Sequence, residues 1–151
     1  YGLELQYVYD AWLIKSETIK KNSDVNDEYH ASVNGFEYTL SNIYGGKDLG
    51  FIMEWQWDER FDENPFGISN GGFYALRLAV NDAASTEVLA GQVIDLDTGK
   101  LVSTRVEASR RIGQSYKVEF EFSNINDPKE NTLLYSIKED DYSQISLSYF
   151  W

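Results

Sequence analysis

The 151-residue chain contains no cysteine and only two prolines. The lack of cysteine excludes a disulfide scaffold and a thiolate metal site. Lys and Arg together number 13 against 25 Asp and Glu, which gives a formal net charge of −12. Nucleic acid is therefore excluded as a partner, because phosphate binding needs clustered positive charge. The sequence also lacks an uninterrupted apolar run of about 18 residues, which excludes a transmembrane helix.

What the chain has in quantity is aromatic residues, which make up 15% of it. Disordered acidic chains are poor in aromatics, so this composition indicates a folded protein. The length suits one domain, residues 1–151. The chain starts without Met inside an alternating run, which indicates a processed protein or a part of a longer one.

Apolar and polar residues alternate with a period of two almost throughout, and turn-forming residues separate the alternating runs. We therefore expect an all-β fold without helices. A change of phase before Gly35 predicts a β-bulge there, and the fifth run has apolar residues on both faces. The eight expected strands cover residues 1–13, 29–44, 49–58, 74–80, 87–94, 102–109, 116–123 and 143–151.

The connections between these runs alternate between short and long. Bacterial outer-membrane barrels have short periplasmic turns and longer extracellular loops. Counting back from Trp151 in the periplasm puts each short connection on the periplasmic side and each longer one outside. The pattern predicts an antiparallel up-and-down transmembrane β-barrel with about eight strands. Whether these strands are a whole barrel or the C-terminal part of a larger one stays open.

In such a barrel the polar stripes of the strands face the interior and the apolar stripes face lipid. Charges of both signs on the polar stripe fit an enclosed space, where each charge needs a partner, and they fit a face in contact with water equally well. The residues expected inside are Glu4, Glu54, Arg77, Arg105, Glu107, Lys117, Glu119 and Glu121. Tyr and Trp favour the boundary between hydrocarbon and water. They predict a periplasmic girdle that includes Tyr1, Tyr44, Tyr116, Tyr149 and Trp151, and an outer one with Trp55, Trp57 and Phe61.

The last residues, SQISLSYFW, resemble the C-terminal signature of bacterial outer-membrane β-barrel proteins. Ile145, Leu147, Tyr149 and Trp151 form its apolar and aromatic positions. The resemblance implies that this strand is recognised by the barrel assembly machinery. Residues 62–99, 110–121 and 133–151 are also similar to the C-terminal portion of longer, uncharacterised proteobacterial outer-membrane proteins. That similarity implies a bacterial outer-membrane location and a barrel architecture, and it implies nothing about an activity.

Three motifs have a chemical interpretation and a plainer one. His30 and Ser32 share a strand face and resemble one element of outer-membrane lipid A deacylases, although no carboxylate is clearly placed to orient the imidazole. DLDTGK, with Asp95, Asp97 and Gly99, begins like a calcium loop but lacks the remaining ligands, so a tight hairpin turn is expected. Acidic loop residues either bind divalent cations that bridge lipopolysaccharide phosphates or are simply solvated: Asp58, Glu59, Asp62, Glu63, Glu139, Asp140 and Asp141.

The sequence thus predicts a non-enzymatic integral outer-membrane β-barrel, a membrane scaffold or part of a channel for small solutes or export. No catalytic residue, metal site or cofactor is expected. The expected partners are outer-membrane lipid, lipopolysaccharide and the barrel assembly machinery, and either other chains or a missing N-terminal part of the same barrel. The alternatives are a soluble all-β ligand-binding module and, third, an outer-membrane lipid-modifying hydrolase that uses His30 and Ser32.

Overall fold

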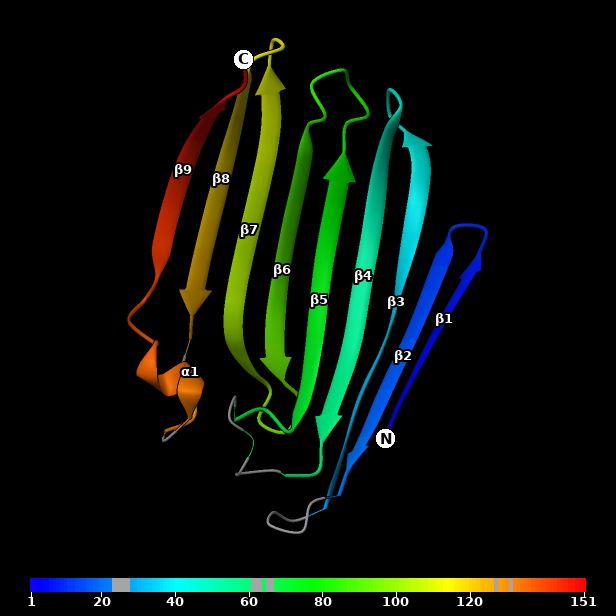
Figure 1. Cartoon of the computed structure of the whole chain (residues 1–151), viewed down its shortest axis with the longest axis vertical. Helices are drawn as coiled ribbons and strands as arrows, with labels where there is room; N and C mark the ends of the chain where they lie inside the picture. Colours follow the sequence, from blue (N-terminus) through cyan, green and yellow to red (C-terminus); the bar gives the residue numbers. More distant parts are fainter. Residues whose placement is uncertain (23–27, 61–63, 65–66, 127, 131) are drawn as a thin grey trace.

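The computed structural model describes residues 1–22, 28–60, 64, 67–126, 128–130 and 132–151. Nine strands form one antiparallel sheet in which each strand pairs with its neighbours in sequence (Figure 1). The all-β, up-and-down prediction is confirmed, but among the described strands hydrogen bonds do not close the sheet into a barrel. The strands are β1 (Gly2–Tyr9), β2 (Trp12–Lys21), β3 (Tyr29–Ile43), β4 (Lys47–Asp58), β5 (Asn70–Ala79), β6 (Glu87–Asp95), β7 (Lys100–Ile112), β8 (Tyr116–Ile125) and β9 (Tyr142–Tyr149).

The expected first strand, residues 1–13, is instead a hairpin of β1 and β2. The chain reverses at Asp10, which has a φ of 51°, and Tyr9 then pairs with Trp12. Asp tolerates the left-handed conformation that this tight turn requires. Leu13 consequently lies on the opposite face from Tyr9, and residues 15–21 are strand where a loop was expected. The sheet therefore has nine strands rather than eight.

The predicted bulge at Gly35 is also wrong. Gly35 pairs in regular register with Lys15 on one side and Glu54 on the other. The register shifts instead lie between Leu40 and Ile43 and between Val93 and Ile94. What changes before Gly35 is the polarity of each face and not the strand geometry.

The expectation of no helix fails at one place. Leu133–Ser136 form a single turn, α1, in the connection between β8 and β9. The Thr132 hydroxyl caps this turn by accepting a hydrogen bond from the Tyr135 N–H at 3.2 Å. Among the described residues, none of the helical structure is long and apolar enough to cross a bilayer.

The two ends of the sheet differ in their connections, as expected. One end has the turns at residues 10–11, 44–46, 80–86 and 113–115, together with the C-terminus, and the other has α1 and the N-terminus (Figure 1). One connection departs from the expected division into short and long ends. Residues 96–99, at the end expected to have the longer connections, are fewer than residues 80–86 at the other end. Since the strand number is odd, Tyr1 lies at the opposite end from Trp151, so its predicted place in the same girdle is wrong.

The sheet is a single layer with little apolar core. Among the described residues the buried apolar side chains are Ile68, Ala75 and Val102. The accessible surface of the chain is 10533 Å² at a mass of 17.4 kDa. A folded globular monomer of that mass exposes about 7,900 Å². This sheet therefore exposes far more surface than a self-contained domain of its size.

Candidate functional site: the two faces of the sheet

One face of the sheet, here called the apolar face, carries large apolar side chains from all nine strands. The strand registers align these residues across neighbouring strands. They are exposed: Trp55 to 41%, Leu76 to 50%, Phe120 to 37% and Leu147 to 66%. The apolar face is represented on successive strands by Leu5, Ile14, Phe36, Met53, Leu76, Ala90, Val106, Phe120 and Leu147.

Aromatic residues gather where the apolar face meets the C-terminal end of the sheet. Tyr116 and Tyr149 are cross-strand partners, with ring centroids 5.1 Å apart. Trp151 follows β9 and lies 6.3 Å from Tyr149, centroid to centroid. On the same face, toward the opposite edge of the sheet, the ring centroids of the cross-strand partners Trp12 and Tyr38 are 4.6 Å apart. Ile145, Leu147 and Tyr149 all lie on the apolar face, as the alternation of β9 predicts.

The N–H of Trp55 shows how the aromatic residues of the other end are held. Its indole nitrogen donates to Asn70 Oδ1 at 2.8 Å, and Asn70 Nδ2 donates to Asp97 Oδ1 at 2.8 Å. An apolar ring with its polar atom bonded to hydrophilic neighbours suits a boundary between hydrocarbon and water. Phe61, expected beside Trp55 and Trp57, lies outside the described residues.

The opposite face, here called the polar face, holds all eight residues that the sequence assigned to a barrel interior. They are Glu4, Glu54, Arg77, Arg105, Glu107, Lys117, Glu119 and Glu121. The charges on β7 and β8 are paired. Arg105 contacts Glu107 at 2.6 Å and Glu121 at 2.7 Å, and Lys117 contacts Glu119 at 2.7 Å. The charges of opposite sign on these two strands therefore form local ion pairs on one face.

Two further partners of charged residues on the polar face were missed by the sequence analysis. Glu37 of β3 pairs with Arg77 of β5 across the intervening β4. The Tyr142 hydroxyl donates to Glu121, which links β9 to β8. Glu37 stands on the polar stripe of its run, but its pairing depends on the register that brings Gly50 opposite Arg77 and leaves room above β4. Alternation alone carries no such information.

Glycines on the polar face lie under side chains of neighbouring strands. A Cβ placed on Gly35 would lie 2.6 Å from Glu54 Cγ, and one on Gly91 would lie 2.8 Å from Phe73 Cε2. Both distances are shorter than real Cβ contacts, so any other residue at these positions would force its neighbours to shift. The polar face also includes apolar residues of β5 and β6, such as Phe73 and Leu89, which is why the fifth expected strand could not be phased.

A hollow of about 430 Å³ lies on the polar face over β6 to β9, lined by Glu87, Leu89, Glu107, Lys117, Glu119 and Gln144 among others. A second hollow of about 480 Å³ lies mainly on the apolar face, lined by residues that include Phe36, Phe51, Met53, Tyr74 and Leu76. The first is rich in charge and the second in hydrocarbon, so the two faces offer opposite chemical environments.

Polar residues interrupt the apolar face in two places, at Gln92, Thr104 and Asn124 on β6 to β8 and in a larger group on β2 and β3. On β2 and β3 its positions near the long connection are Ser16, Thr18, Ser32 and Asn34. The Ser16 hydroxyl donates to Asn34 Oδ1 at 2.7 Å, and Asn34 Nδ2 approaches Ser32 Oγ at 3.5 Å. These groups bond to one another within the face, which lowers the cost of placing them in an apolar environment.

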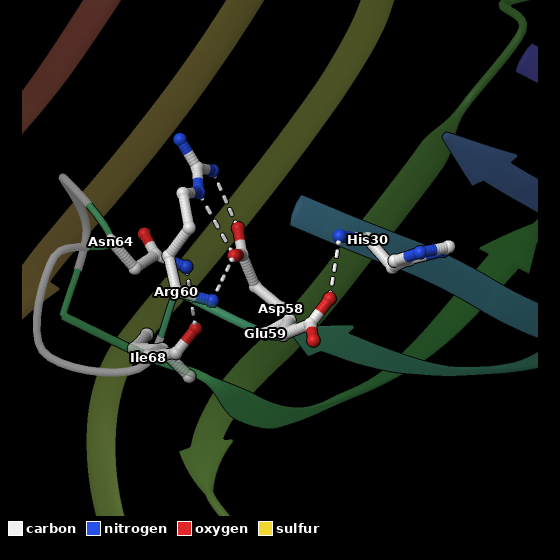
Figure 2. Close-up of polar contacts among 6 residues, drawn as sticks. All are labelled: His30, Asp58, Glu59, Arg60, Asn64 and Ile68. Carbon is white, nitrogen blue, oxygen red and sulfur yellow. Dashed lines mark hydrogen bonds and ion pairs between the residues drawn. The ribbon is translucent and has the colours of Figure 1, made fainter. Parts of the chain in front are cut away.

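At the end of the sheet with the long connections, polar contacts hold Glu59 and Arg60, the two residues that follow β4 (Figure 2). Arg60 donates to both carboxylate oxygens of Asp58, at 2.9 and 2.5 Å, and its guanidinium lies 4.1 Å from the centre of the Tyr29 ring. The hydrogen bond to Asp58 raises the pKa of the Arg60 guanidinium. The Glu59 carboxylate accepts a hydrogen bond from the backbone N–H of His30 at 2.9 Å. Asp58 and Glu59 are thus engaged in contacts that fix this segment.

The arrangement around His30 and Ser32 gives the hydrolase hypothesis no assembled triad among the described residues. His30 Nε2 lies 3.9 Å from Glu28 Oε1, which is beyond hydrogen-bond distance. Glu28 also contacts Lys20. Ser32 Oγ is approached by Asn34 instead. The hypothesis therefore gains no geometric support.

The DLDTGK segment is the predicted hairpin turn. Asp95 Oδ1 accepts from the Asp97 and Thr98 N–H groups at 2.9 and 3.3 Å, and Gly99 has a φ of 70°. Of the acidic loop residues, Asp141 accepts from Asn124 and from the Ile125 N–H, while Asp62 and Glu63 lie outside the described residues. Within the part of the chain that the structure describes, His, Asp and Glu side chains form no group of three or more suited to a metal ion.

Comparisons with protein-family models, with curated proteins and with solved structures find no match for this chain.

Proposed function

We propose that this chain is part of an integral outer-membrane β-barrel protein without enzymatic activity, which acts as a membrane scaffold or as part of a channel for small solutes or export. The observation that carries the proposal is the exposure of the apolar face on every strand, opposite a face of paired charges. Water-soluble sheets cover such a face with a second layer. Lipid would cover it here.

Charge pairing supports the same proposal. A barrel with the polar face inside encloses its charges, which then need partners of the kind that Arg105 finds in Glu107 and Glu121.

Strand number bears on the choice between scaffold and channel. About eight strands leave an interior that side chains fill, whereas open channels have about sixteen to eighteen. A barrel near the size of this sheet would be filled by Phe73, Leu89 and the paired charges and would act as a scaffold. A conducting channel requires a considerably wider barrel, which a single-channel conductance measurement in planar bilayers would reveal.

The direct experiment is partitioning. We expect the protein, refolded with phosphatidylcholine vesicles, to float with the lipid and to stay there after an alkaline wash. In the absence of lipid and detergent it should aggregate, because its apolar face is exposed. A stable, well-folded monomer in aqueous buffer would refute the proposal.

The second candidate, a soluble ligand-binding module, is favoured by one observation. The hollow of about 480 Å³ over Phe51, Met53 and Leu76 falls within the range of small-molecule sites, about 300–1,000 Å³. An apolar ligand seated there would quench Trp55 fluorescence in a lipid-free, monomeric sample. Such saturable quenching would support the module, whereas quenching that occurs only in vesicles would not.

A further inference from the structure

The two outer strands of the sheet have open edges. Among the described residues β1 pairs only with β2, and β9 pairs only with β8. Tyr1 and Lys20 exchange both backbone hydrogen bonds, at 2.7 and 2.8 Å. Because bonded and non-bonded pairs alternate in an antiparallel ladder, the N–H and C=O groups of Gly2, Glu4, Gln6 and Val8 point away from β2.

The same reasoning applies to β9. The Phe150 N–H donates to the Ser115 C=O at 2.7 Å. By alternation, Ser143, Ile145, Leu147 and Tyr149 direct their backbone groups away from β8. Each unsatisfied backbone group in hydrocarbon costs several kcal/mol, so open edges do not occur in lipid. If the sheet lies in a membrane, both edges are paired.

The direction of the strands limits what can pair with them. Nine antiparallel strands in sequence order leave β1 and β9 running the same way (Figure 1). Joined to each other, they would form a parallel pair. A second copy in the same membrane orientation offers only the same two edges in the same direction, so it too would pair in parallel. Bacterial outer-membrane barrels are antiparallel, with an even number of strands.

We propose that an odd number of strands from sequence outside residues 1–151 bridges β1 and β9, with the strand beside β1 antiparallel to it. This inference rests on the proposed function and specifies the partner that completes the barrel. One such strand would satisfy both edges, which gives ten strands as the smallest antiparallel barrel. Its outward side chains would be apolar, in continuation of Leu3, Leu5 and Tyr7.

Charge specifies the bridging strand further. Glu4 lies directly opposite Glu17, and like charges facing each other across a strand pair are destabilising. A Lys or Arg on the polar face of the bridging strand, level with Glu4, would offset this repulsion. Lys15 lies on the same face, beside Glu17 and diagonal to Glu4, so a basic residue of the partner would add to an attraction already present. The partner is therefore an amphipathic strand, with a basic residue favoured on its inward face.

The test is photo-cross-linking of the full-length protein in isolated outer membranes, with p-benzoylphenylalanine in place of Gln6. The products are digested and identified by mass spectrometry. A matched variant carries the same group at Ser146, which pairs with Glu119, and must give a product with β8. Partitioning of the same sample into alkali-washed membranes reports on the proposed function separately.

We expect the Gln6 variant to yield a cross-linked peptide absent from residues 1–151, with a Lys or Arg in that segment. A product with residues 142–149, from the same molecule or a second copy, would overturn the inference, because it shows parallel closure. So would a Gln6 product confined to β2, which holds its cross-strand partner Lys15, while the Ser146 variant reacts with β8. If the protein fails to partition into membranes, the proposed function is wrong. A cross-link from Gln6 to a peptide from outside residues 1–151 would in that case still support the bridging strand.

Discussion

Leu76 provides the sharpest test of which face meets lipid. It lies on the apolar face of β5, between Phe51 of β4 and Ala90 of β6, and is 50% exposed. In water, Leu76→Lys would remove at most half of the 1.5–3 kcal/mol that full burial of Leu provides, or about 1 kcal/mol. On the lipid face at mid-depth, Lys costs about 2–4 kcal/mol. That cost corresponds to a 30- to 1,000-fold change in the folding equilibrium, at about 1.4 kcal/mol per factor of ten.

The assay is equilibrium unfolding by guanidinium chloride in phosphatidylcholine vesicles, followed by the fluorescence of the four tryptophans. Ser146→Lys is the matched control, because Ser146 lies on the polar face opposite Glu119 and should change stability by no more than about 0.5 kcal/mol. A loss below about 1 kcal/mol for Leu76→Lys, or an equal loss for both variants, would refute the assignment of the faces.

Three further outcomes are expected. Glu37→Gln should destabilise the protein by about 1–2 kcal/mol in the same unfolding assay, because it leaves the partly exposed Arg77 without its carboxylate partner. This value lies between those of exposed and buried ion pairs. If the double variant Glu37→Gln with Arg77→Met recovers no stability, the explanation is wrong. The double variant Asn34→Leu with Ser16→Ala, which removes the hydroxyl together with its acceptor, should increase stability in vesicles and increase aggregation in buffer, as measured by light scattering, because both positions then offer only hydrocarbon to lipid. The hydrogen bond from the Thr86 N–H lowers the pKa of the Asp82 carboxyl, in the turn between β5 and β6. The ionised carboxylate therefore stabilises the fold at neutral pH, and this contribution is lost as the pH falls below about 3.9 and through the lower folded-state pKa. A pH titration of the free energy of unfolding should show a smaller loss at acid pH for Asp82→Asn than for the unaltered protein, and an unchanged profile would contradict the hydrogen bond.

The strand pattern was largely predictable, and so was the separation of the two faces. Side chains alternate strictly between the two faces of a strand. Once β8 was recognised, Glu119 and Glu121 therefore had to lie on the opposite face from Phe120. The two-residue turn at Asp10 was missed because Ala11 and Leu13 happen to continue the apolar alternation of β1. Polar residues of the apolar face, such as Asn34, break the apolar alternation of β3 although the strand stays regular. The break was therefore mistaken for a bulge.

Sequence by itself therefore determined that strands form, where most of them lie and which residues share a stripe, because these properties depend on local spacing alone. Only the tertiary structure decided the register, since hydrogen bonding between distant segments selects one alignment among several. Register brought Glu37 to Arg77 and placed Gly35 beneath Glu54. The hairpin of β1 and β2 decided the strand count, and with it the parallel direction of the two open edges.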